Sequence, residues 1–231
     1  MEYSIQQGIT NLLDELKSYL FSQRELYGED IYVDYDLQKE PKRSVKIESN
    51  RDKLIKFYYE IKDCKKCELA KNRTKLVFGG GNPDSKIMLI GEAPGFYEDR
   101  EGKPFVGKAG QLLDKILNAI QLSRDQVFIT NVVKCRPPEN RDPLPVECEA
   151  CNFILKRQLE IMEPEFILVL GRVAASVLLK SEGSIANLRG KIYQVSGAQA
   201  VVTYHPAALL RNAGLKRSTW EDVQMFQKLY Q

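Results

Sequence analysis

Five cysteines are the residues of this sequence with the clearest chemical potential: Cys64, Cys67, Cys135, Cys148 and Cys151. An odd number of cysteines, in a chain whose first residues show no export signal, argues against disulfides and for a metal or cluster site. Zinc would use the two C-x-x-C pairs, 64/67 and 148/151, whereas the dispersed set 64, 67, 135 and 151 suits a [4Fe–4S] cluster. Spacing favours the cluster, with zinc and ordinary buried cysteines as alternatives.

Three further side chains could bind or activate a planar ligand. His205 is the only histidine of the sequence, and an imidazole can exchange a proton near neutral pH, although a lone histidine is as often structural. Asn131 ends the run VFITN, where its amide offers a donor and an acceptor together, although an asparagine there is more often a turn former. Phe105, between glycines in GKPFVGKAG, could stack on a ring, although core packing is the commoner fate of a phenylalanine.

Two loop stretches carry polar groups in unusual company. GEAPG, residues 91–95, resembles a glycine-rich loop but fits no common phosphate fingerprint, and it contains a carboxylate. HPAALLRN, residues 205–212, could present a hydrophobic wedge, Leu209 and Leu210, beside a phosphate contact from Arg211. The alternative for this second stretch is a short helix in the core.

The elements that must position these residues form an alternating pattern. Four β-rich runs, at 86–91, 126–133, 166–171 and 200–205, alternate with helical patterns at 109–120, 146–162, 172–180 and 218–230. Apolar strands alternating with helices predict an α/β fold with a parallel sheet covered on both faces. Functional groups gather at the carboxyl ends of such strands, where Glu92, Asn131 and His205 fall.

The first fifty residues differ from the rest. They carry 6 Lys or Arg against 10 Asp or Glu, whereas the remaining residues carry 28 against 21. A basic body suits a polyanion such as nucleic acid. Residues 5–20 draw an apolar stripe typical of an amphipathic helix, and residues 34–50 are typical of a linker. We therefore expect an N-terminal extension, 1–50, and a catalytic domain, 51–231. We favour packing of the helix on its own domain over a protein partner, and we expect a cytoplasmic, monomeric protein without a membrane segment.

The stretches GEAPGFYED, GKPFVGKAGQLLD, FITNVVKCRPPENRDP and HPAALLRN, with four of the cysteines, resemble the family 4 uracil-DNA glycosylases, the iron–sulfur members of their superfamily. The resemblance covers Cys64 to Tyr230 and leaves residues 1–50 unexplained. It implies an α/β/α sandwich around a short, about four-stranded parallel sheet. It also implies base-excision repair, in which deoxyuridine is flipped out of DNA, uracil is released by hydrolysis and an abasic site remains.

The resemblance also implies residue roles in a base pocket. Phe105 would stack on uracil, Asn131 would bond its O4 and N3–H edge, and His205 would donate to O2. Glu92 would face the sugar or position water, and Glu98 would help to exclude thymine. Gly91 and Gly95 would let the backbone approach the nucleotide. Ala93 stands where family 1 enzymes have a water-positioning aspartate, which leaves the water-activating group open.

The same resemblance implies a cluster and DNA contacts. The cluster ligands would be Cys64, Cys67, Cys135 and Cys151, with Cys148 a bystander and the cluster structural. Phosphate contacts would come from Lys134, Arg136, Arg141 and Arg211, and the wedge from Leu209 and Leu210. A cluster-containing branch of the superfamily that traps DNA covalently inserts a basic, histidine-bearing loop. This sequence has RPPENRDPLP after Cys135 instead, so the resemblance implies no covalent intermediate. The alternatives are a non-catalytic iron–sulfur DNA-binding or polymerase-associated module, or a glycosylase for another deaminated base.

Overall fold

The computed structural model describes residues 2–27 and 48–231, with side chains of residues 10–22, 24 and 48–231. Its contacts divide the chain into two units, residues 1–47 and 48–231, close to the expected boundary at Asn50. The first unit contains helix α1, Glu2–Tyr27, as the apolar stripe predicts. Most of the predicted linker lies outside the described residues, and the packing of α1 stays a prediction.

The second unit is a mixed six-stranded sheet in the order β1-β3-β2-β4-β6-β5. The strands are β1 Gly80–Gly81, β2 Ile87–Gly91, β3 Phe128–Asn131, β4 Phe166–Leu170, β5 Ile192–Val195 and β6 Ala198–Thr203. β3, β2, β4 and β6 pair in parallel and are the four strands expected from the sequence. The short edge strands β1 and β5 pair antiparallel and add to the expected sheet.

The helices of this unit connect the strands. They are α2 Asn50–Ile61, α3 Phe96–Glu101, α4 Lys108–Ala119, α5 Pro145–Met162, α6 Arg172–Leu179, α7 Ile185–Leu188, α8 Pro206–Arg211 and α9 Lys216–Tyr230. Short 3₁₀ turns lie at Glu68–Lys71, Arg124–Gln126, Pro138–Asn140 and Ala213–Leu215. None of the described helices is long and apolar enough to cross a membrane.

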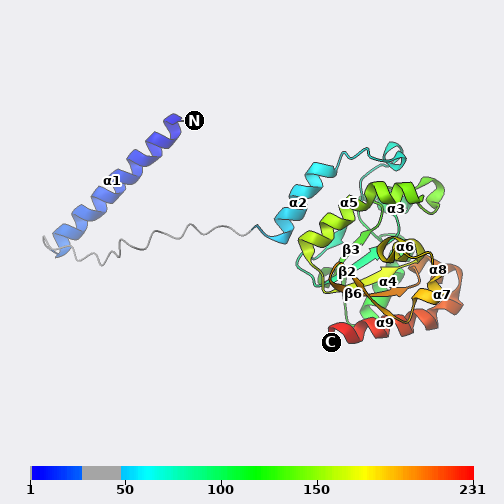
Figure 1. The fold of residues 1–231 in the computed structure, drawn as a ribbon. Coiled ribbons are helices and arrows are strands. Elements are labelled where there is room, and N and C mark those ends of the chain that lie inside the picture. Colours follow the sequence, from blue (N-terminus) through cyan, green and yellow to red (C-terminus); the bar gives the residue numbers. More distant parts are fainter. Residues whose placement is uncertain (1, 28–47) are drawn as a thin grey trace. The chain divides into compact units, whose positions relative to one another are not determined.

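Two apolar cores cover the two faces of the sheet, because successive strand residues point to opposite sides. Met88 and Ile90 of β2 pack with residues of α2, α5, α6 and α7. Ile87 and Leu89 pack with residues of α4 and α9 on the other face. Figure 1 shows this arrangement, with α2 and α5 on one side of the strands and α9 on the other. The three layers confirm the α/β/α architecture.

Candidate active site

A cavity of about 330 Å³ opens at the carboxyl ends of β2, β3 and β6. Its lining contains every predicted base-pocket residue except Gly91, together with two of the predicted phosphate contacts: Glu92, Ala93, Gly95, Glu98, Phe105, Asn131, His205, Arg141 and Arg211. These residues come from four separate stretches of the sequence, and the parallel strands bring them to one edge of the sheet. The cavity also contains residues that the sequence did not single out, among them Asn140 and Asp142.

Asn131 lines the floor of the cavity, and Gly91 lies beside it as its partner in the β2–β3 register. A Cβ on Gly91 would lie 2.4 Å from Asn131 Oδ1 and 2.6 Å from Phe105 Cζ, so only glycine fits there. Asn131 is buried, and its Oδ1 has no hydrogen-bond partner among the described residues. An unpaired buried acceptor costs roughly 1–3 kcal/mol. A ligand that donates a hydrogen bond at this point would remove that cost.

Hydrogen bonds with two side chains, Glu98 and Arg124, hold the backbone on either side of Phe105. Phe105 has φ 52°, a left-handed conformation that is uncommon for a phenylalanine. Glu98 Oε1 accepts hydrogen bonds from the backbone N–H of Val106 at 2.8 Å and of Gly107 at 2.9 Å. From the other side, Arg124 donates to the carbonyl oxygens of Pro104 and Phe105. The carboxylate of Glu98, which is predicted to help exclude thymine, therefore also holds this loop in place.

His205 lies beside Phe105 and caps helix α8. The two ring centroids are 5.4 Å apart with an interplanar angle of 31°. His205 Nδ1 accepts a hydrogen bond from the backbone N–H of Ala207 at 3.2 Å. The proton of the neutral ring must then reside on Nε2. Burial and the positive charge of Arg211 lower the pKa of His205 to about 4, so the ring is a neutral donor at pH 7.

Glu92 is one of a pair of carboxyl groups. Its side chain lies within hydrogen-bonding reach of Asp142. Burial and the negative charge of Asp142 raise the pKa of Glu92 to about 7, while Arg172 and Arg211 act in the opposite direction. Asp142 Oδ2 in turn pairs with Arg172 Nη2 at 2.7 Å. The sequence carries no signal for the pair, because its members are fifty positions apart and on different loops.

The four cysteines predicted as cluster ligands line a small common cavity, together with Lys134 and Arg73. Arg73 Nη1 donates to Cys135 Sγ at 3.2 Å. Burial raises the pKa of the Cys135 thiol and raises that of Cys151 to about 11. Cys148 lines a different cavity with Asn152 and Arg172, and its predicted place outside the ligand set stays a prediction. Among the residues that the structure describes, no three His, Cys, Asp or Glu side chains are arranged to hold a single metal ion.

Two predicted DNA contacts are wrong. Lys134 is 0% exposed, and its Nζ donates to Thr130 Oγ1, the Asn131 carbonyl and Gln158 Oε1 at 2.6–2.7 Å. It braces the carboxyl end of β3 from inside and does not reach a phosphate. Leu209 is 4% exposed because α8 turns it into the core, whereas Leu210 is 53% exposed.

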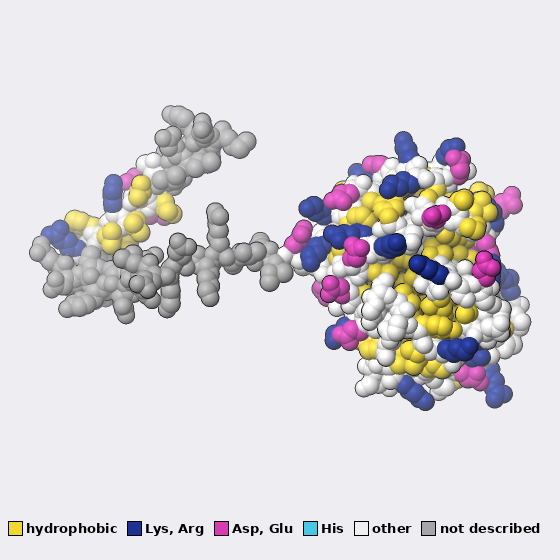
Figure 2. Space-filling view, viewed as in Figure 1, with side chains coloured by type: hydrophobic (Ala, Val, Ile, Leu, Met, Phe, Trp, Pro, Cys, Tyr) yellow, Lys and Arg dark blue, Asp and Glu magenta, His cyan; other side chains and the backbone are white. Residues whose placement is uncertain are grey.

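The remaining predicted contacts lie at the surface around the cavity. Arg211 lines the cavity directly. Arg141 also lines it, but its guanidinium forms a two-pronged pair with Glu147, with nitrogen–oxygen distances of 2.9 and 2.7 Å. Figure 2 shows Lys and Arg side chains spread over the visible face of residues 48–231, with Asp and Glu among them. In that view the basic balance of this unit does not form one patch.

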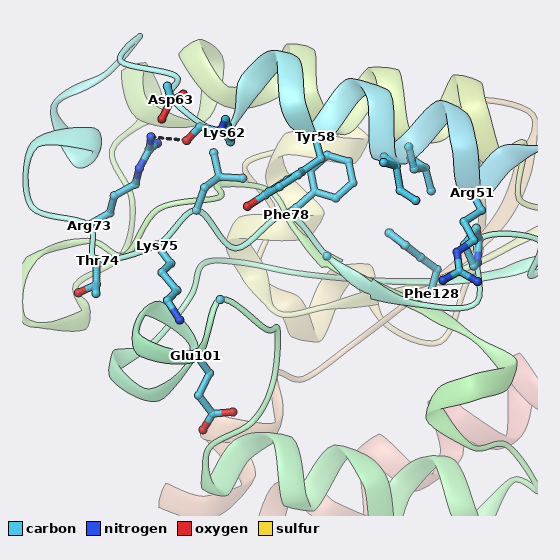
Figure 3. Close-up of a pocket in the computed structure, with 16 residues that line it drawn as sticks. Arg51, Tyr58, Lys62, Asp63, Arg73, Thr74, Lys75, Phe78, Glu101 and Phe128 are labelled. Carbon is cyan, nitrogen blue, oxygen red and sulfur yellow. Dashed lines mark hydrogen bonds between the residues drawn. The ribbon is translucent and has the colours of Figure 1, made fainter.

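A larger groove of about 680 Å³ lies between α2 and the loops that precede β1. In Figure 3, Tyr58 points from α2 into this groove, and Lys75 extends toward Glu101 on the opposite wall. Arg73 Nη2 donates to the Lys62 carbonyl at 2.8 Å along the rim. The groove contains none of the predicted base-contacting residues, so the smaller cavity is the candidate active site.

Comparisons with known proteins show the family to which the chain is related. A family model described as the uracil DNA glycosylase superfamily matches residues 78–229. The chain is 46% identical to a type-4 uracil-DNA glycosylase of Sulfurisphaera tokodaii, over 77% of this chain and 85% of that protein. It is 49% identical to a type-4 uracil-DNA glycosylase of Saccharolobus solfataricus, over 74% and 83%. It is 43% identical to one of Archaeoglobus fulgidus, over 74% and 89%.

Proposed function

The chain belongs to the uracil-DNA glycosylase superfamily, with relatives of the type-4 branch, and we propose that it removes uracil from DNA in base-excision repair. It is a DNA N-glycosylase, which hydrolyses the bond between base and deoxyribose. The target atoms are inaccessible inside a duplex, so the nucleotide must be flipped into the cavity, which costs a few kcal/mol of unstacking. The observation that carries uracil as the base is the unpartnered Oδ1 of Asn131 beside the Phe105 ring.

Uracil fits the polarity of this floor. Its N3–H would donate to Asn131 Oδ1, and its O4 would accept from the amide nitrogen of the same side chain. Cytosine presents an acceptor and a donor at the same two positions, so it would leave both groups of Asn131 opposed. Phe105 supplies the stacking face, and its fixed backbone keeps that face in place without ordering on binding.

The bond breaks with negative charge on uracil and positive charge on the sugar. His205 would donate from Nε2 to uracil O2, where the negative charge collects. A neutral donor suits this role because its pKa of about 4 keeps it uncharged before the reaction, and it needs no proton from solvent. Ionised Glu92 would stabilise the positive sugar. Since Ala93 carries no polar group, Asp142 is the second carboxylate that can hold the attacking water beside Glu92.

Cys64, Cys67, Cys135 and Cys151 would hold a [4Fe–4S] cluster. The supporting observation is that all four line one small cavity, in which Arg73 donates a hydrogen bond to the sulfur of Cys135. Such a centre would supply a covalent link between chain segments, not a reaction step. These segments are the loop after α2, the loop after β3 and helix α5. The loop after β3 also carries Arg141 and Asp142 to the active-site cavity.

Incubation with uracil-containing DNA, followed by alkali to cleave abasic sites, tests the proposal. We expect cleavage with the unaltered protein from single-stranded, U:A or U:G substrates. Asn131→Ala should lose roughly 10²–10³-fold in single-turnover rate, comparable to the loss of one polar group at a developing charge, and should keep its affinity for DNA. No cleavage of any uracil substrate would refute the activity and leave a DNA-binding module as the better account.

A further inference from the structure

The short helix α3 forms one rim of the active-site cavity and exposes two neighbouring aromatic rings. Gly95, which precedes the helix, and Glu98 within it line the cavity. Phe96 and Tyr97 lie between them and are 43% and 58% exposed. Their ring centroids are 5.5 Å apart with an interplanar angle of 84°. Exposed apolar surface at the mouth of a polar cavity commonly marks a binding site.

Tyr97 is placed beside the loop that holds the base-stacking ring. A Cβ added to Gly107 would lie 3.3 Å from Tyr97 Cδ2, so the tyrosine ring rests against the backbone two residues after Phe105. The Tyr97 ring is therefore a neighbour of the base pocket and does not belong to its floor. A nucleotide adjacent to the flipped one is the part of the substrate that would reach this position.

Two arginines gather around Phe96. The guanidinium carbon of Arg136 lies 5.1 Å from the Phe96 ring centroid, and that of Arg100 lies 5.6 Å from it. Arg136 is held again by its Nε, which donates to Asn140 Oδ1 at 2.8 Å, and Asn140 lines the cavity. Cation–π contacts of this kind orient a guanidinium and leave its donors free for an anion.

Two of the three acidic residues of α3 are occupied by backbone contacts, and the third, Glu101, is the last residue of the helix and lines the groove beside α2. Asp99 is buried and accepts the backbone N–H of Thr74 at 2.9 and 3.1 Å. Glu98 Oε1 accepts the two N–H groups that hold the Phe105 loop. The exposed surface at Phe96 and Tyr97 therefore combines two aromatic rings with two arginines, and single-stranded nucleic acid prefers this combination.

We propose that α3 is a nucleotide subsite for the strand that contains the flipped uridine. Tyr97 stacks on the base next to the uridine, and Arg100 and Arg136, oriented by Phe96, bind the phosphate beside it. The inference rests on the proposed function, because flipping a nucleotide deprives its neighbours of a stacking partner. Because both guanidinium groups lie over Phe96, Tyr97 is the ring assigned to the base.

Binding to short single-stranded oligonucleotides tests the stacking contact. Each oligonucleotide contains 2′-fluoro-2′-deoxyuridine, which resists cleavage because fluorine disfavours positive charge on the sugar. A base-less nucleotide replaces the 5′ or the 3′ neighbour. We expect the unaltered protein to lose roughly 5- to 150-fold in affinity when one of these two bases is removed. Tyr97→Ala should bind intact DNA more weakly by that factor and lose nothing further with the base-less strand.

Two variants serve as controls. Tyr97→Phe keeps the ring and should behave as the unaltered protein. Tyr59→Ala removes a tyrosine of α2 that is 64% exposed and does not line the cavity, and it should change neither affinity nor its dependence on the neighbouring base. Unchanged affinity in Tyr97→Ala, or equal losses on intact and base-less strands, would overturn the stacking assignment.

The phosphate contact is measured by salt dependence. Removing one contact to single-stranded DNA should reduce the slope of log affinity against log salt by about 0.7, which we expect for Arg100→Gln. An unchanged slope would overturn the role of the arginine. Uracil release by the same preparations separates the two proposals. Absence of release from every substrate refutes the proposed function, whereas normal release with unaltered Tyr97→Ala binding refutes only the α3 subsite.

Discussion

At the scale of single residues, the cavity contains polar groups whose ordinary properties are shifted by their surroundings. His205 is a neutral donor because burial and Arg211 disfavour its charged form. Glu92 is only partly ionised at pH 7 because burial and Asp142 disfavour its negative charge. Both shifts favour the neutral form of the group, so the cavity contains an uncharged hydrogen-bond donor and a carboxyl group that titrates near pH 7. In the proposed mechanism the donor would face the base and the carboxyl group the sugar.

The carboxyl pair predicts a pH dependence. If ionised Glu92 is the active form, kcat/KM should rise as pH increases through about 7, the pKa of this group, while His205 stays neutral down to about pH 4. Asp142→Asn removes the neighbouring negative charge and releases Arg172 from its ion pair, and both changes lower the pKa of Glu92. The acid limb of the profile should therefore move to lower pH.

Single-turnover uracil release between pH 5 and 9 measures that limb. Glu92→Gln should lose it and retain a low, flat rate. Asp84→Asn alters an exposed carboxylate in the turn before β2 and should leave the limb where it is. A limb that stays in place in Asp142→Asn would show that Asp142 does not control the titrating group.

At the scale of elements, the four parallel strands and the long helices follow from the alternation of apolar runs in the sequence. The edge strands do not, because β1 consists of two glycines and β5 is four residues long and partly exposed. Neither stretch has enough residues to show a period. β5 is joined to β6 by a turn with positive φ at Ser196 and Gly197. The Ser-Gly pair is typical of a two-residue hairpin turn, so the sequence does contain a signal for this connection.

The sequence predicts which residues lie together where each one follows a strand, but it does not predict contacts that depend on the rest of the fold. Glu92, Asn131 and His205 follow strands, and the parallel register brings them together. The prediction that Lys134 contacts DNA is wrong because its amino group binds three oxygen atoms inside the protein. One of them belongs to Gln158, which only the fold places beside Lys134. Of the adjacent Leu209 and Leu210, a helix can turn only one inward, and the sequence does not say which.

Substitution of Gly91 tests the close packing of Gly91 against Asn131 and Phe105, because the β2–β3 register places Gly91 beside Asn131. Gly91→Ala places a methyl group 2.4 Å from Asn131 Oδ1 and 2.6 Å from Phe105 Cζ, so both side chains must move. We expect uracil release to fall by orders of magnitude and the free energy of unfolding to fall by roughly 1–3 kcal/mol.

Gly80→Ala in β1 is the matched control, because its added methyl group would meet only Pro104, at 3.7 Å or more. It should leave the rate of uracil release unchanged. Chemical denaturation and single-turnover assays on both variants measure the two effects. Full activity in Gly91→Ala would contradict the close packing of the floor.

At the scale of the whole molecule, the small cavity lined by Cys64, Cys67, Cys135 and Cys151 lies where three segments of residues 48–231 meet. If these cysteines hold an iron–sulfur cluster, Cys151→Ser should lose iron and absorbance near ~400 nm, and should lower the thermal midpoint, because the link between α5 and the other segments is broken. Iron and sulfide analysis, absorption spectra and thermal unfolding measure these losses.

Cys148→Ser provides the comparison, because Cys148 is buried like Cys151 but faces another cavity. We expect it to retain iron and colour. Loss of bound metal in Cys148→Ser with retention in Cys151→Ser, or a colourless protein that contains zinc, would contradict the ligand set.

The strand order β1-β3-β2-β4-β6-β5 also has a consequence for synthesis on the ribosome. β2 lies in the middle of the sheet, yet its neighbour β4 is translated some seventy-five residues later, and His205 follows only after β6. The active site therefore cannot assemble on a partly made chain. A product terminated between β4 and β6 would lack His205 and expose the unpaired edge of β4. Unpaired strand edges promote aggregation. Premature stops before residue 205 should thus yield insoluble, inactive fragments.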